Sequence, residues 1–237
     1  MMYPETEAEL AEAVASASSP LRIQGGGTRP IGTPREGDVL STSALSGITL
    51  YEPGALTLVA KAGTPMTEVE AALDAENQIL PFEPMDHRAL LGTTGTPTIG
   101  GVVGANVSGP RRVQAGACRD SLIGVRYVNG EGDVIKNGGR VMKNVTGYDL
   151  VKLMAGSYGT LGVMSEVSFK VLPKPDFITT LVILGADWTA TSAIFSKAMG
   201  SPFEVSGAAR LPAGSFDAER GAVLLRLDGF EASVKYR

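Results

Sequence analysis

Hydrophobic positions in the first eighty residues alternate between helical spacing and short apolar runs. Leu10, Val14 and Ala17 recur at helical spacing, whereas the run Leu21–Ile23 is short and leads directly into three glycines. The patterns predict helices over 4–18 and 66–77 and strands over 21–23, 38–42, 48–52 and 56–60. The order of helix, strand, glycine loop, strands and helix is typical of a small α/β unit.

The middle of the chain is rich in proline and glycine. Residues 81–97 show no regular pattern, and a loop of that length inside a compact domain is usually functional. After it the pattern predicts one or two helical turns over 100–105, strands over 122–129, 134–137 and 163–172, and a helix over 147–155.

Pro173 and Pro175 predict a domain boundary. Beyond them the pattern predicts a strand over 177–184, a helix over 187–199 and strands over 205–210 and 222–227. We therefore expect an α+β protein, with one domain over 1–174 and part of a second α/β domain over 175–237.

Composition excludes several classes of function. The chain has 237 residues, 43% of them hydrophobic, and a net charge of −4 without a Lys/Arg cluster, which disfavours nucleic-acid binding. One cysteine and one histidine cannot supply a His/Cys metal cluster, so we expect no metal site. A lone cysteine, an acidic N-terminus and the lack of an apolar run of roughly 20 residues favour a cytoplasmic location.

Two glycine-rich loops carry the candidate chemistry. The first is Gln24-Gly25-Gly26-Gly27-Thr28, and the second runs from Pro97 to Arg112 without a carboxylate. Glycine allows the backbone to come within hydrogen-bond reach of a ligand, and successive backbone N–H groups can bind an anion. We expect Thr98, Gly100 and Gly101 to add a hydroxyl and two further backbone donors. Both loops are then expected to hold one long, phosphate-bearing cofactor, the alternative being ordinary tight turns.

Two common nucleotide motifs are absent from the sequence. A Rossmann fingerprint requires glycine at the sixth position of its loop, where this chain has Pro30. The pattern Gly-x-x-x-x-Gly-Lys-Ser/Thr of a P-loop does not occur.

Several sequence motifs resemble those of a known protein family. Gly25–Thr28, Thr98–Gly101, Asn106–Gly109 and Gly159–Val163 together resemble the FAD-binding domain of the vanillyl-alcohol-oxidase type, also called PCMH-type flavoproteins. Gly109-Pro110-Arg111-Arg112, Met142–Asp149 and Ala155–Gly162 resemble the FAD-binding subunits of bacterial glycolate oxidase. The resemblance is strong over residues 5–174 and weak beyond.

This resemblance implies site residues by position. Gly25, Gly26, Gly27 and Thr28 would wrap the FAD pyrophosphate. Gly162 and Val163 would lie by the adenine. The ribityl chain and the flavin would be lined by the second loop and its surroundings, at Pro84, Thr98, Ile99, Gly100, Gly101, Asn106, Ser108 and Gly109. Some relatives link the flavin to a histidine where this chain has Thr28, so we expect non-covalent FAD.

The resemblance also implies partners. The chain would be the FAD-binding subunit of a multi-subunit glycolate (2-hydroxy acid) dehydrogenase, with a homologous FAD-linked subunit and an iron–sulfur subunit as partners. One alternative is a non-catalytic assembly module, and another is a stand-alone flavin-dependent alcohol or sugar oxidase. Homo-oligomerisation and membrane association through partners stay open.

Several further side chains need an interpretation. His87 is either a loop residue or a general base, and Cys118 is either a buried thiol or a flavin attachment point. Arg111 and Arg112 either cover a loop or bind a substrate carboxylate or the cofactor phosphates. Asp149 is interpreted as a helix N-terminal charge.

Overall fold

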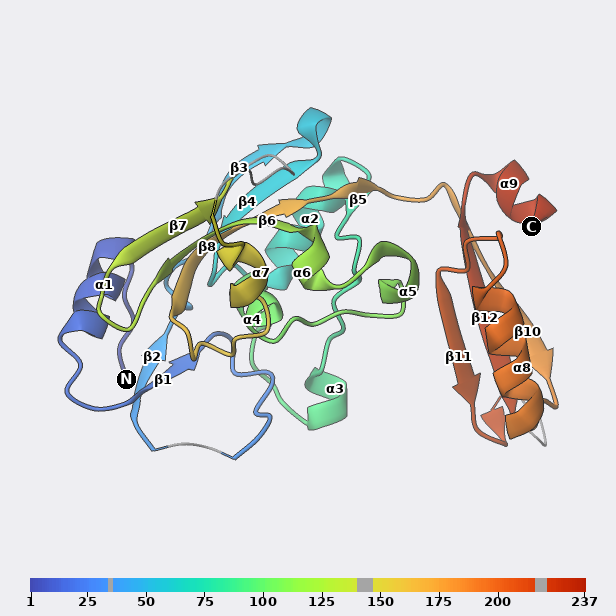
Figure 1. Ribbon diagram of the computed structural model, residues 1–237, viewed down its shortest axis with the longest axis horizontal. Coiled ribbons are helices and arrows are strands. Elements are labelled where there is room, and N and C mark those ends of the chain that lie inside the picture. Colours follow the sequence, from blue (N-terminus) through green and yellow to red (C-terminus); the bar gives the residue numbers. More distant parts are fainter. Residues whose placement is uncertain (34–35, 140–146, 216–220) are drawn as a thin grey trace. The chain divides into compact units, whose positions relative to one another are not determined.

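The computed structural model of the chain describes residues 1–33, 36–139, 147–215 and 221–237 (Figure 1). It forms two compact units, of which the first comprises Met1–Ser108 and Ala117–Leu172 and the second Gly109–Gly116 and Pro173–Arg237. The domain boundary predicted between residues 174 and 175 lies close to this division. No pattern along the chain indicated that residues 109–116 join the second unit. Residues 142–146, which belong to the motif that resembles the glycolate oxidase subunits, lie outside the described residues.

The first unit is built on a five-stranded antiparallel sheet with the strand order β3-β4-β8-β6-β7 (Figure 1). Its strands are β3 (Ile48–Glu52), β4 (Thr57–Lys61), β6 (Leu122–Val128), β7 (Val134–Gly138) and β8 (Val163–Lys170). All five were predicted, with ends that differ by at most two residues. Six of the eight residues of the central strand β8 are buried, on both of its faces.

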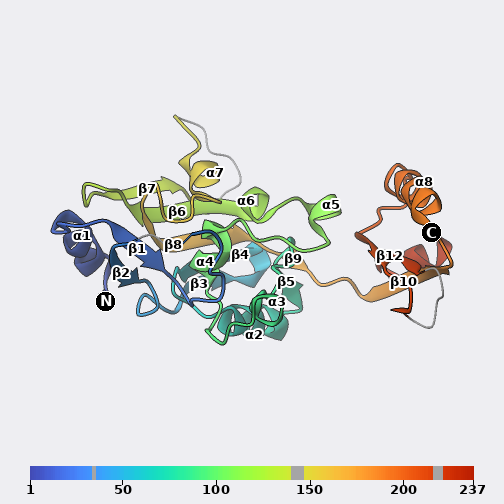
Figure 2. The same ribbon diagram turned by 90° about the horizontal axis from the view of Figure 1, so that it is seen from below.

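A parallel strand pair delivers the first glycine loop. In both views β1 (Leu21–Gln24) and β2 (Asp38–Ser41) lie beside α1 (Glu7–Ala15) (Figures 1 and 2). Leu10 of α1 and Leu40 of β2 are fully buried in one cluster with Val163 of the sheet. The helix begins after Thr6, whose hydroxyl accepts a hydrogen bond from the Glu9 N–H, three residues later than the pattern predicted the helix to begin.

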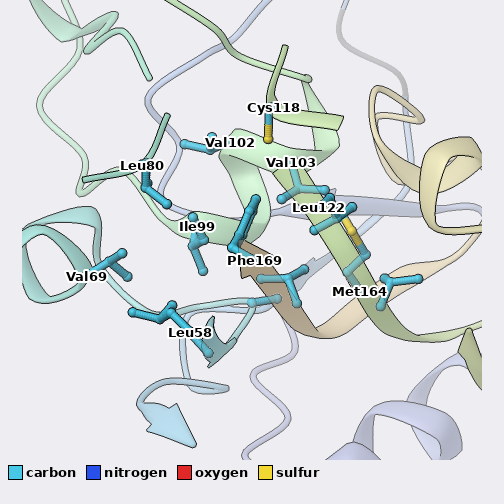
Figure 3. Close-up of a cluster of buried hydrophobic side chains, with 14 of the residues drawn as sticks. Leu58, Val69, Leu80, Ile99, Val102, Val103, Cys118, Leu122, Met164 and Phe169 are labelled. Carbon is cyan, nitrogen blue, oxygen red and sulfur yellow. The ribbon is translucent and has the colours of Figure 1, made fainter. Parts of the chain in front are cut away.

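A large apolar cluster anchors the second glycine loop. The short helix α4 (Ile99–Gly104) sends Ile99, Val102 and Val103 into this cluster, where each is at most 1% exposed. Figure 3 shows them beside Phe169 of β8 and Leu58 of β4. Burying each such side chain is worth roughly 1.5–3 kcal/mol, so α4 is held firmly against the sheet.

The remaining elements of the first unit are short. They are η1 (Pro53–Ala55), α2 (Met66–Ala75), β5 (Gln78–Ile79), α3 (Arg88–Leu91), α6 (Cys118–Ser121), α7 (Leu150–Met154) and β9 (Leu172–Pro173), which extends into the second unit. The helices predicted over 66–77 and 147–155 are confirmed as α2 and α7, and α3 lies in the segment predicted to be irregular. No helix in the described part of the chain is long and apolar enough to cross a membrane.

The second unit is a smaller antiparallel sheet with helices. Its strands have the order β10-β12-β11, and its core joins Val223, Leu225 and Leu227 of β12 to residues of α8. The elements are α5 (Arg112–Ala115), β10 (Phe177–Leu184), α8 (Trp188–Met199), β11 (Gly207–Leu211), β12 (Ala222–Gly229) and α9 (Glu231–Tyr236). The expected mixture of helices and sheets is confirmed in both units.

Candidate functional site

A cavity of about 170 Å³ opens in the first unit where the end of β1, the helix α4 and the start of β8 meet. Glycines predominate among its lining residues, and no aspartate, glutamate or histidine belongs to the described lining. The cavity brings together eight of the predicted site residues, namely Gly25, Gly26, Gly27, Thr28, Thr98, Gly100, Gly101 and Gly162. The two glycine loops, far apart in sequence, therefore form one site.

The first loop touches the segment that leads into the second loop, backbone to backbone. A Cβ atom on Gly26 would stand 1.5 Å from the carbonyl oxygen of Thr96, and one on Gly95 would stand 1.9 Å from the carbonyl oxygen of Gly26. The Thr93 hydroxyl also donates a hydrogen bond of 3.0 Å to the carbonyl oxygen of Thr28. Glycine at 26 and 95 is thus required by close approach. The positive φ in the first loop belongs to Gly27, at +68°.

The first loop presents backbone donors that the protein does not use. Among the described residues, no hydrogen bond involves the backbone N–H of Gly25, Gly26, Gly27 or Thr28. These consecutive groups lie in the wall of the cavity. Gly25 and Gly26 are partly buried and Gly27 is exposed, so successive N–H groups are left for a ligand that accepts several hydrogen bonds.

The second loop differs from the prediction. The N–H of Gly100 donates to the carbonyl oxygen of Ala62 at 2.8 Å, and the N–H of Gly101 donates to Oγ1 of Thr98 at 3.3 Å. The expectation of two further backbone donors is therefore wrong, because helix capping and the contact with Ala62 use both groups. A Cβ on Gly100 would lie 2.6 Å from the Ala62 Cβ, so this glycine allows close packing.

A third segment closes the cavity beside β1. Gly159 has a φ of +75°, and a Cβ there would lie 2.9 Å from the Cβ of Ile23. At Gly162 the φ is +142°, and a Cβ would lie 2.5 Å from the carbonyl oxygen of Val128. Both positions therefore require glycine, for reasons of backbone conformation and packing.

Arg29 is a site residue that the sequence analysis missed. It directly follows the first glycine loop, is partly buried and lies in the cavity wall. Its Nη2 atom lies 3.3 Å from the point that a Cβ of Gly101 would occupy. Its position directly after Gly-Gly-Gly-Thr could have indicated a site residue, but a single arginine beside a loop is common on protein surfaces.

The six other predicted site residues do not line the cavity. Ile99 and Val163 have buried side chains in the apolar clusters, and Pro84 is partly buried in the loop before α3. Asn106 Oδ1 accepts a hydrogen bond from the Arg119 N–H, and Ser108 Oγ accepts one from the Cys118 N–H. Gly109 belongs to the second unit. Contact between these residues and a cofactor stays a prediction.

The side chains with two interpretations are now placed. Cys118 is fully buried, and burial raises the pKa of its thiol, which disfavours the thiolate. Asp149 accepts a hydrogen bond from the Lys152 N–H and caps α7, which confirms its interpretation as a helix N-terminal charge. Arg111 Nη2 lies 3.4 Å from Asp228 Oδ1 within the second unit. His87 lies at the start of α3, where its Nδ1 lies 3.1 Å from the Met85 carbonyl oxygen.

Comparison with known proteins identifies the family. A family model described as an FAD binding domain matches residues 1–138, which is more than half of the chain. The chain belongs to this FAD-binding family. Glycolate oxidase subunit GlcE of Escherichia coli (strain K12) is 38% identical over 98% of this chain and 63% of that protein. The resemblance to PCMH-type flavoproteins and FAD as the cofactor are thereby confirmed.

More distant relatives agree with this assignment. Glycolate oxidase subunit GlcD of Bacillus subtilis (strain 168) is 33% identical over 70% of this chain and 34% of that protein. Among solved structures, an alkyldihydroxyacetonephosphate synthase matches 99% of this chain and 48% of its own, with a TM-score of 0.78 and 17% identity, which supports the fold. The chain spans less than two thirds of the length of these relatives.

The contact between the loops predicts the effect of one added methyl group. Gly26→Ala places a carbon within 1.5 Å of the Thr96 carbonyl oxygen, so the loops must separate. We expect a loss of about 1–3 kcal/mol in the free energy of unfolding, measured by urea denaturation. Gly54→Ala is the matched control, because a Cβ there meets nothing within 4 Å, and its stability should be unchanged. A Gly26→Ala protein as stable as the wild type would contradict the contact.

Proposed function

We propose that this chain is the FAD-binding subunit of a multi-subunit glycolate (2-hydroxy acid) dehydrogenase. The observation that carries the proposal is the chemistry of the cavity. Among the described residues, its wall offers unused backbone N–H groups and one arginine, without a carboxylate to repel an anion. Such a set of donors suits the pyrophosphate of a dinucleotide. The similarity to glycolate oxidase subunit GlcE supports the choice of enzyme.

The size of the cavity suits one section of the cofactor. At about 170 Å³ it is smaller than the roughly 300–1,000 Å³ of pockets that enclose a whole drug-sized ligand. Gly25 to Thr28 would hold the pyrophosphate, and Gly162 would lie by the adenine. When bound, FAD supplies the hydride and electron chemistry that side chains lack. The residues of this chain bind and orient it.

Attachment of FAD is proposed to be non-covalent. Thr28 occupies the position where some relatives have a linking histidine, and its hydroxyl is a poor nucleophile. Cys118 is fully buried, and the raised pKa of its thiol keeps it protonated. Neither side chain is therefore suited to form a bond with the flavin.

The proposed partners are a homologous FAD-linked subunit and an iron–sulfur subunit. Two relatives, GlcE and GlcD, are both described as subunits of a glycolate oxidase, which supports an assembly of related chains. Electrons from the flavin would pass towards the iron–sulfur subunit. We propose a cytoplasmic location, with any membrane association through these partners.

A non-catalytic assembly module is the second candidate. It is favoured by one observation, namely that the sequence has a single histidine, so it offers few side chains of the type most often used as a general base. A stand-alone oxidase is disfavoured for the same reason. Flavin content separates the assembly module from the FAD-binding subunit, since an assembly module would hold FAD weakly or not at all.

The first functional prediction concerns the cofactor. The purified chain should be yellow, and precipitation with acid should release FAD into the supernatant, measured by its absorbance and fluorescence. A colourless protein that does not take up added FAD would support the assembly module. Flavin retained in the pellet would contradict non-covalent attachment and direct attention to Cys118.

The second functional prediction concerns catalysis by the isolated chain. Oxidation of an α-hydroxy acid needs a base near the hydroxyl and a cationic group or metal at the carboxylate. The sequence has one histidine, His87, and its Nδ1 lies 3.1 Å from the Met85 carbonyl oxygen, so we expect that the FAD-loaded chain does not oxidise glycolate at a useful rate. The measurement is the flavin absorbance after mixing with excess glycolate without oxygen.

The decisive control is a variant of the single histidine, His87→Ala. Rapid bleaching of the flavin by glycolate in the wild type, lost in this variant, would show that the chain is an enzyme in its own right. Bleaching that requires an added partner subunit would agree with the proposal.

A further inference from the structure

The guanidinium group of Arg29 has no protein partner in the described structure. It is partly buried in the cavity wall, close to Gly101, yet no hydrogen bond or ion pair joins its side chain to another described residue. Burial lowers the pKa of Arg29 from its usual value, because the charged guanidinium is partly removed from water. A cation in that position is costly unless something compensates its charge.

Two other arginines of the first unit, unlike Arg29, have carboxylate partners. Arg126 is paired with Glu7, and Arg88 holds both carboxylate oxygens of Asp86 through its Nε and Nη2 atoms. The charge of Asp86 also acts on Arg29, but the hydrogen bonds of that carboxylate are made to Arg88. Among the described residues, the protein therefore supplies no carboxylate partner to Arg29.

The surroundings of Arg29 fit an anion that accepts several hydrogen bonds. The unused N–H groups of Gly25 to Thr28 precede it directly in the chain and line the same cavity. Gly101, which lacks a side chain, leaves space beside the Nη2 atom, because a Cβ there would lie at 3.3 Å. A planar guanidinium can donate two parallel hydrogen bonds to a phosphate group.

We propose that Arg29 binds the pyrophosphate of FAD, together with the first glycine loop, and is the main source of charge in cofactor binding. This inference rests on the proposed binding of FAD. It assigns to one side chain a role that backbone donors alone cannot fill, because only Arg29 brings a full positive charge into the described cavity lining. Binding should then depend on that charge and on the ionic strength.

The test is the affinity of the apo chain for FAD, measured by the change in flavin fluorescence. Arg29→Gln should bind FAD roughly tenfold to a hundredfold more weakly, the usual effect of losing a charge-assisted hydrogen bond. Arg29→Lys keeps the charge and should lose less. Arg22→Gln is the matched control, because Arg22 is exposed on β1 and does not line the cavity, and its affinity should equal that of the wild type.

Two competitors that differ only in the pyrophosphate identify the group that Arg29 binds. ADP should displace FAD from the wild type at much lower concentration than adenosine does. In Arg29→Gln this advantage of ADP should shrink by the same factor as the affinity for FAD. Urea denaturation of each variant shows whether the substitution has disturbed folding, and Arg29→Lys provides a second, milder variant.

The outcomes separate this inference from the proposed function. A wild-type chain that does not bind FAD would overturn the proposed function. If the wild type binds FAD and folded Arg29→Gln binds it equally well, Arg29 has no such role and the inference fails. A folded Arg29→Gln protein with weaker FAD binding but an unchanged advantage of ADP over adenosine would also overturn it, because the loss would then not involve the phosphates.

Discussion

The approach of the first glycine loop to the residues just before the second, backbone against backbone, is the contact on which the rest of the site depends. Gly26 and Gly95 lie so close to opposing carbonyl oxygens that even a methyl group would not fit. One loop follows β1, which packs with α1, and the other leads into α4, which is buried against the central sheet. The contact therefore ties two separate parts of the first unit together, and the cavity forms beside it.

Within this arrangement the two loops have different functions. The loop from Gly25 to Thr28 keeps its backbone N–H groups unused, whereas the N–H groups of Gly100 and Gly101 bond to the protein itself. The second loop packs against the protein, whereas the first loop is the one that we propose binds the cofactor. Arg29 adds a positive charge next to the donors, where no carboxylate lines the described cavity.

Much of the architecture could be predicted from the sequence because the patterns are local. Apolar runs such as Phe177–Leu184 form strands whose bounds match the structure. The density of glycine was interpreted as access of the backbone to a ligand, whereas Gly26 and Gly95 allow two segments of the protein to approach each other. The fate of the N–H groups of Gly100 and Gly101 could not be predicted. It depends on Ala62 and on capping by Thr98, contacts that only the folded chain creates.

The roles of single side chains also depend on contacts that only the folded chain creates. Arg29 looks like an ordinary surface arginine in the sequence, and its burial beside Gly101 follows from the meeting of distant loops. Asn106 and Ser108 were expected to line the cofactor, but their side chains bond to the backbone of residues near α6, outside the cavity lining. Short polar side chains serve ligands and loops equally well, so residue type alone cannot decide between these roles.

The central claim is that the first loop offers its N–H groups to the cofactor while the second does not. Amide hydrogen exchange, followed residue by residue with and without FAD, tests this most directly. Gly25 to Thr28 should exchange rapidly without FAD and become strongly protected with it, whereas Gly100 should be protected in both states. Unchanged exchange at Gly25 to Thr28 in the presence of saturating FAD would contradict the account.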